Sequence, residues 1–251
     1  VLSKVARSTD DAVASTKFDV ALTKDRAVRV VALINHNLSA DGLYRIRGST
    51  VSNFASTVYD SGWVSAWPAV YSTLTLEWEE DNWWSGVMLD EDKAGYTWTI
   101  VCVLSAPAVG RYWRVEFDDT TNSDTYVQLG RVFISGQWQP VLTMNWGASL
   151  SWETDTKIET AIGGTEYFDR RSGYRVARFL LDGMSTDEGI VRAFEIDRRA
   201  GIDEEVFYIF DPDDTYNMIR RAFVGRLREL SPLEYPYINI TRKAYEIKEL
   251  I

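Results

Sequence analysis

Short runs of apolar and polar residues, separated by turns of Gly, Asp, Asn and Ser, fill the first 145 residues. The runs are rich in Val, Ile, Thr, Tyr, Phe and Trp, a composition typical of β-strands. Residues 28–34 are almost continuously apolar, which predicts a strand buried on both faces. The predicted strands are Lys17–Thr23, Ala27–Asn35, Leu43–Gly48, Tyr96–Leu104, Arg111–Phe117, Tyr126–Ser135 and Gln139–Met144. Many short antiparallel strands without a long helix favour a β-sandwich or jelly roll.

A mixed pattern follows after about residue 165. Tyr174–Leu181 predicts a strand, and Ser185 with Glu188 matches the capping box that begins many helices. Apolar residues at helical spacing over Glu188–Ala200, with Gly201 as a stop, predict one helix. Further strands are predicted over Val206–Phe210, Asn217–Leu230 and Tyr237–Leu250.

The distribution of tryptophan places a boundary between these patterns. Nine of the ten Trp lie in residues 1–146, and Gly163-Gly164 marks a turn. We therefore predict a mainly β protein in two domains. An N-terminal antiparallel jelly-roll β-sandwich spans 1–145, a linker spans 146–164, and a smaller α+β domain, mostly β and serving assembly, spans 165–251.

Composition excludes several classes of function. The formal net charge is −10, whereas a generic nucleic-acid binder needs a basic face. No stretch approaches the roughly 18–20 apolar residues of a membrane span. The single cysteine, Cys102, cannot form an intrachain disulfide and is expected to be a buried, inert thiol. We therefore predict neither nucleic-acid binding nor membrane insertion.

Few residues offer catalytic chemistry. A Ser-His-Asp arrangement would have to use His36, the only histidine, with Ser39 and with Asp25 or Asp41. Asn35-His36-Asn37 lies at a predicted strand end, where such residues satisfy backbone groups in a turn. We predict no catalytic residue and no enzyme activity.

Two acidic runs, Glu77–Asp81 and Asp90–Asp92, suggest two further kinds of site, a glycosidase active site and a calcium site. A glycosidase needs two carboxyl groups about 5–9 Å apart across a cleft, and calcium needs several oxygen ligands. Runs of this kind usually form solvated loop faces, and no ligand spacing here is diagnostic. We predict no cofactor and no bound metal, with structural calcium left open.

Aromatic and arginine side chains are the candidate contacts. Residues 51–95 are irregular and rich in Trp, and long insertions on β-sandwiches often carry binding function. Exposed Trp can anchor a protein interface or stack on a sugar, while packing onto the sandwich is the alternative. Arg alternating with apolar residues in the second domain suits protein contacts. The candidate contact residues are Trp63, Trp67, Trp83, Trp84, Arg175, Arg178, Arg226 and Arg228.

Three segments carry a resemblance to a known family: His36-Asn37-Leu38, Tyr112-Trp113-Arg114 and Leu129-Gly130-Arg131-Val132-Phe133. Over about residues 15–140, the chain resembles the discoidin-like (galactose-binding-like) domains found in minor structural proteins of bacteriophage tails. From about residue 160, segments that include Arg199–Ile202, Val206–Asp213 and Phe223–Leu227 are similar to the companion region of such proteins.

The resemblance implies a structural component of a phage tail tip or baseplate, made in the bacterial cytoplasm and located in the virion tail. Its expected partners are other tail proteins and copies of itself. The alternative is a carbohydrate- or receptor-binding module that uses the Trp-rich insertion 51–95 to contact a host surface glycan. No aligned set of sugar-binding residues is present in the loops.

Overall fold

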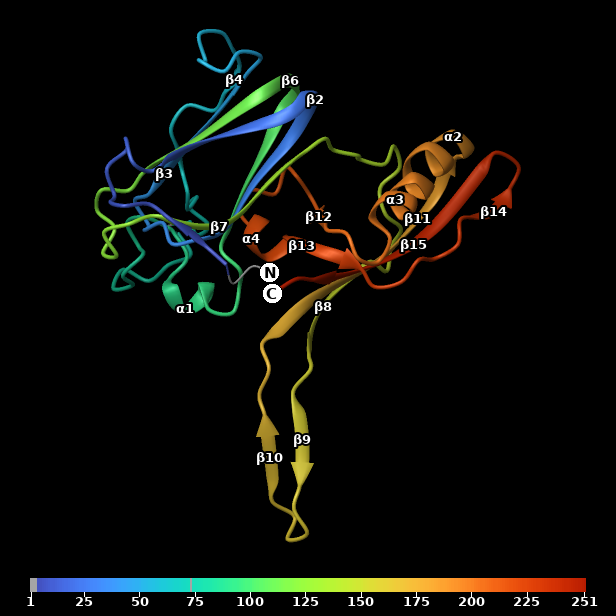
Figure 1. The fold of residues 1–251 in the computed structure, drawn as a ribbon. Coiled ribbons are helices and arrows are strands. Elements are labelled where there is room, and N and C mark those ends of the chain that lie inside the picture. Colours follow the sequence, from blue (N-terminus) through green and yellow to red (C-terminus); the bar gives the residue numbers. More distant parts are fainter. Residues whose placement is uncertain (1–3, 73) are drawn as a thin grey trace. The chain divides into compact units, whose positions relative to one another are not determined.

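The computed structural model describes residues 4–72 and 74–251 (Figure 1). The chain is mainly β, as the sequence predicts, and the described residues form antiparallel sheets of seven and six strands and a two-stranded ribbon. Two compact units are present. Unit 1 comprises Val1–Gln137 and Ile209–Ala222, and unit 2 comprises Trp138–Tyr208 and Phe223–Ile251.

Unit 1 contains the seven-stranded sheet, in the order β1-β7-β2-β6-β3-β4 with β5 beside β3. Its strands are β1 (Ala6–Arg7), β2 (Lys17–His36), β3 (Leu43–Ser49), β4 (Thr57–Asp60), β5 (Val64–Ser65), β6 (Thr99–Asp118) and β7 (Gln128–Ser135). Two short helices, α1 (Asp90–Lys93) and α4 (Met218–Arg221), accompany the sheet.

The two 20-residue strands β2 and β6 each run through two layers (Figure 1). The first part of β2 pairs with the last part of β6, and its last part pairs with the first part of β6, with register shifts between. Of these two long strands, β7 pairs with the last part of β2, and β3 pairs with the last part of β6. Bulged bends of this kind carry strands from one layer of a β-sandwich to the other.

The sequence predicts two separate strands in place of each long one. The breaks in its pattern, at Lys24-Asp25-Arg26 and at Ala106-Pro107, fall in or beside the bends. Pairing continues beyond them, so that each pair of predicted strands is a single element.

One core lies between the two layers of unit 1. It includes Val31, Leu33 and Cys102 from one layer, and Ile46 and Trp113 from the other. Val30–Ile34 are at most 5% exposed, which confirms the strand predicted to be buried on both faces. The predicted burial of Cys102 is also confirmed.

The segment 209–222 completes unit 1 from far along the chain. Ile219 packs against the core, and the Arg220 guanidinium donates a hydrogen bond to the Tyr71 hydroxyl at 3.2 Å. This segment and the core line an apolar cavity of about 170 Å³ with no charged residue in its walls. The strand predicted over Asn217–Leu230 is wrong in its first part, because these residues form α4 before the strand β13 (Ala222–Leu227) begins.

Unit 2 contains the six-stranded sheet, in the order β12-β13-β15-β11-β8 with β14 beside β15. Its strands are β8 (Ser149–Thr154), β11 (Gly173–Ser185), β12 (Val206–Ile209), β13 (Ala222–Leu227), β14 (Glu234–Tyr237) and β15 (Ile240–Glu249). No strand forms over the predicted Gln139–Met144; Pro140 lacks the N–H that a central strand needs.

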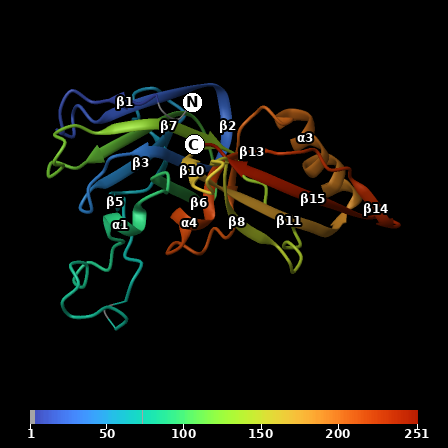
Figure 2. The same ribbon diagram turned by 90° about the horizontal axis from the view of Figure 1, so that it is seen from below.

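A continuous helical segment covers one face of this sheet, next to β11 and β15 (Figure 2). It consists of α2 (Thr186–Glu188), the π-helical turn η1 (Gly189–Phe194) and α3 (Glu195–Ala200). The Ser185 hydroxyl accepts a hydrogen bond from the Glu188 amide at 3.2 Å, which confirms the predicted N-cap. The Glu188 carboxylate accepts from the Trp138 indole and the Val141 amide rather than from Ser185.

The predicted domain limits differ from the two units. Residues 146–164, expected to be a linker, contain β8 and β9 (Lys157–Thr160), and β8 pairs with β11. Residues 138–145 belong to unit 2 rather than to the first domain, and 209–222 belong to unit 1. Local composition cannot reveal such an exchange, because it depends on which core a distant segment joins.

Candidate interaction surfaces

The four predicted Trp contacts lie in different environments. Trp63 is 41% exposed and Trp84 is 81% exposed, whereas Trp83 is half-buried. Trp67 is only 6% exposed, so its assignment as a contact residue is wrong. Its indole donates to the Leu38 carbonyl at 2.9 Å, and its ring packs edge-on against Trp98. A buried indole with a satisfied N–H belongs to the core.

An exposed cluster of three indoles, which we call the Trp triad, is formed by Trp78, Trp83 and Trp84. The ring centres lie 4.6 Å apart for Trp78–Trp83, 4.5 Å for Trp83–Trp84 and 5.8 Å for Trp78–Trp84. The interplanar angles are between 61° and 90°. Trp78, 70% exposed, is absent from the candidates drawn from the sequence, because spacing alone does not show which Trp in the insertion meet.

Backbone contacts hold the loop beneath the triad. The buried Asn82 side chain donates to the Val87 carbonyl at 2.7 Å. The Gly86 carbonyl accepts from the amides of Val70 and Tyr71. Gly86 has a φ of 64°, and a Cβ at this position would collide with the Tyr71 carbonyl. The exposed rings are thus presented on an ordered turn rather than on an extended chain.

The insertion that bears the triad has a single sign of charge. Residues 48–92 contain eight acidic residues and no Lys, Arg or His. Four of the eight are Glu77, Glu79, Glu80 and Asp81, all exposed beside Trp78. None of these four forms an ion pair among the described residues.

A second group of aromatic rings is buried around Lys93. Its ammonium nitrogen lies 4.1 Å from the ring centre of Trp67 and 3.1 Å from a carboxylate oxygen of Asp90. The pKa of the neighbouring His36 is lowered to about 3, mainly by burial and then by the charge of Lys93. His36 Nδ1 accepts from the Leu38 amide at 3.2 Å. His36 is therefore neutral and serves the turn after β2.

Ser39 and Asp119 complete that turn. The Ser39 hydroxyl donates to Asp119 at 2.5 Å, and the Ser39 amide donates to the same carboxylate at 2.8 Å. The hydroxyl is thus engaged by a carboxylate, and the geometry does not bring it to His36 as a nucleophile would require.

Two of the four predicted Arg contacts, Arg178 and Arg228, form ion pairs with the same two glutamates within unit 2. Arg178 and Arg228 each pair with both Glu153 and Glu246, the two Arg228 contacts being 3.0 and 2.9 Å. The hydrogen bond from Arg178 is the main cause that lowers the pKa of Glu153. Arg226, by contrast, is exposed on β13.

Arg175 does not lie on the exposed Arg face that the sequence predicts. Strand side chains alternate between faces, so that Arg175 and Arg178, three residues apart, point to opposite sides of β11. Arg175 is 1% exposed and forms a bidentate pair with the buried Glu249, its Nε–Oε2 distance being 2.8 Å. Its assignment as an interface residue is therefore wrong.

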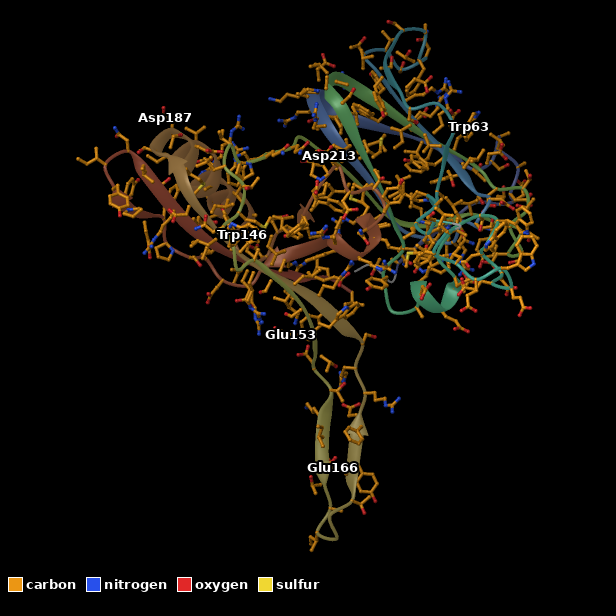
Figure 3. The ribbon with its side chains drawn as sticks, turned by 180° about the vertical axis from the view of Figure 1, so that it is seen from behind. Trp63, Trp146, Glu153, Glu166, Asp187 and Asp213 are labelled. Carbon is orange, nitrogen blue, oxygen red and sulfur yellow. The ribbon has the colours of Figure 1, made fainter. Side chains whose placement is uncertain are left out.

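A two-stranded ribbon, which we call the arm, extends from the sheet of unit 2. It consists of β9 (Lys157–Thr160) and β10 (Glu166–Asp169), which pair with each other and with no other strand among the described residues. All eight residues are exposed, and Figure 3 shows their side chains, Glu166 among them, free of neighbouring elements. The exposed apolar side chains of the arm and its turn are Ile158, Ile162, Tyr167 and Phe168.

Other kinds of site find little support in the described part of the chain. There, no group of three or more His, Cys, Asp or Glu side chains is placed to hold a metal ion, and no helix is long and apolar enough to cross a membrane. Comparison with protein-family models, curated proteins and solved structures finds no match.

Proposed function

We propose that the protein is a structural subunit that works by binding other proteins, without catalysis and without a cofactor. The assembly we propose is the tail tip or baseplate of a bacteriophage, the setting implied by the resemblance over residues 15–140. Its partners are then other tail proteins and further copies of the chain, and its location is the virion tail.

The arm is the observation that carries this proposal. An isolated two-stranded hairpin is marginally stable in water at best, and this one leaves both edges and both faces open. Ile158 and Phe168 face each other across the two strands and are 59% and 53% exposed. Contact with a partner would bury these side chains and pair the free strand edges, the usual role of exposed edges and apolar patches.

Co-expression with the products of the flanking genes tests the proposal. We expect a stable complex with a tail protein, measured by size-exclusion chromatography with light scattering. Ile158→Ser with Phe168→Ser should abolish the complex. The matched control is Thr160→Ser with Glu166→Gln, the polar pair that also faces across the arm, and it should leave the complex intact. Normal assembly of the Ser variant, or the absence of any tail gene nearby, would contradict the proposal.

Carbohydrate or receptor binding through the insertion 51–95 is the second candidate. The high exposure of Trp78 and Trp84 favours it, because indole rings stack on sugars. It predicts that host surface oligosaccharides change the Trp fluorescence of the free protein, and that Trp84→Ala removes this response. Binding unaffected by Trp84→Ala would contradict this second candidate.

A further inference from the structure

We infer that the Trp triad and the carboxylates beside it bind an arginine- or lysine-bearing segment of a partner protein. The inference rests on the proposed function only in taking the partner to be a protein. It concerns a surface of unit 1 and is independent of the arm.

Charge specifies the sign of the partner. Glu77, Glu79, Glu80 and Asp81 place four carboxylates within five residues around Trp78, and no basic residue occurs anywhere in 48–92. Opposed like charges are unfavourable, so an acidic or anionic partner is disfavoured here, while a cationic segment is attracted and oriented.

The ring geometry favours a cation over a sugar. All three pairs of rings in the triad meet at 61° or more, so no two of them form a flat platform for a pyranose ring. Steeply inclined indoles present π-faces in several directions, and a cation over such a face is attracted by the ring quadrupole. Guanidinium groups also stack on aromatic faces, which makes arginine the better-suited side chain.

The same chemistry already operates inside unit 1. The Lys93 ammonium lies over the Trp67 ring and also contacts the Asp90 carboxylate. Indole and carboxylate together thus hold a cation there. At the triad the same two kinds of group are exposed, and no Lys or Arg among the described residues lies over these rings or pairs with these carboxylates.

Titration of the full chain with a hexa-arginine peptide at physiological ionic strength tests this inference, with binding followed by Trp fluorescence and calorimetry. We expect Trp78→Leu with Trp84→Leu, which keeps apolar side chains but removes two π-faces, to weaken binding about tenfold. Glu79→Gln, Glu80→Gln and Asp81→Asn together should weaken it at least as much. Equal melting temperatures of the variants confirm that the fold is intact.

The matched control removes three exposed negative charges outside the insertion, with Asp203→Asn, Glu204→Gln and Glu229→Gln, and should bind like the parent chain. An equal loss of affinity in the control would reduce the effect to net charge and overturn the inference. Binding of a neutral oligosaccharide in preference to the peptide would overturn it as well. If the chain assembles but does not bind the peptide, only this inference is wrong. If the chain binds the peptide but joins no assembly, only the proposed function is wrong.

Discussion

Arg175 and Glu249 form an ion pair in the interior of unit 2. The pair is joined by two hydrogen bonds from the guanidinium and a third from the Arg175 amide at 2.9 Å, and the guanidinium lies 4.9 Å from the ring centre of Phe223. A buried ion pair of this kind contributes little net stability over an apolar pair, but its halves are strongly interdependent.

Arg175→Met should therefore destabilise the protein by about 3–5 kcal/mol, because it leaves the Glu249 carboxylate buried without a counter-charge. Urea unfolding measures the loss. The double variant Arg175→Met with Glu249→Leu should recover much of it. A single variant within about 0.5 kcal/mol of the parent would show that Glu249 reaches water.

His36 makes stability depend on pH. Its pKa is about 3 in the folded chain and near 6.5 when unfolded, so between these values the unfolded state binds a proton that the folded state does not. Below pH 6.5 the free energy of unfolding should therefore fall by up to about 1.4 kcal/mol per pH unit.

Unfolding in urea between pH 5 and 7.5 measures this slope. His36→Asn keeps an acceptor for the Leu38 amide but does not titrate, so its slope should be shallower by about that amount. An unchanged slope in the variant would mean that His36 is already accessible to protons in the folded protein.

Gly189, in the helical segment of unit 2, lies against Thr241 of β15. A Cβ at this position would collide with the hydroxyl of the fully buried Thr241, and lie 3.1 Å from its Cβ. Gly→Ala within a helix ordinarily stabilises by about 1 kcal/mol. Here we expect Gly189→Ala to destabilise by about 1–2 kcal/mol instead, because of overpacking.

A double-mutant cycle isolates that contact. Thr241→Ala removes the obstructing hydroxyl and methyl groups, so Gly189→Ala should cost less in the Thr241→Ala background. Thermal or urea unfolding of the four proteins measures the coupling. Equal costs in the two backgrounds would place the effect in the helix itself.

The strand over residues 43–48 could be predicted because its residues alternate between half-buried and buried positions. The strands within 126–135 and 174–181 are indicated by their apolar and β-branched residues, although their burial does not alternate regularly. The helix up to Gly201 forms as predicted, although Ile190, Val191 and Phe194, whose spacing indicates it, are exposed. The arm could not be predicted, since both faces of β9 and β10 are exposed and no alternation results. Only some of the candidate Trp and Arg contacts lie on the surface. Trp67 and Arg175 show that residue type alone does not separate an interface side chain from a buried one, because burial depends on which elements pack around it.

At the scale of the whole molecule, the chain passes between the two units three times. A fragment of residues 1–137 therefore lacks 209–222, which supplies Ile219 to the core and part of the wall of the apolar cavity. We expect this fragment to melt below the full chain and to bind a hydrophobic dye.

Adding a peptide of residues 209–222 should raise the melting temperature of the fragment and displace the dye, because ligands that bind only the folded state stabilise it. A scrambled peptide is the control. A fragment as stable as the full chain, without the peptide, would show that segment 209–222 is not needed for the folding of unit 1.

The late position of segment 209–222 also determines when unit 1 can complete its core during synthesis. Residues 209–222 are synthesised about 70–85 residues after Gln137, an interval of roughly 4–17 s at ordinary elongation rates. During that interval the first unit has an incomplete core, while the Trp triad on it has already been made. If the chain acts in an assembly as proposed, translation products that end before residue 222 lack part of the first unit and are poorly suited to join that assembly.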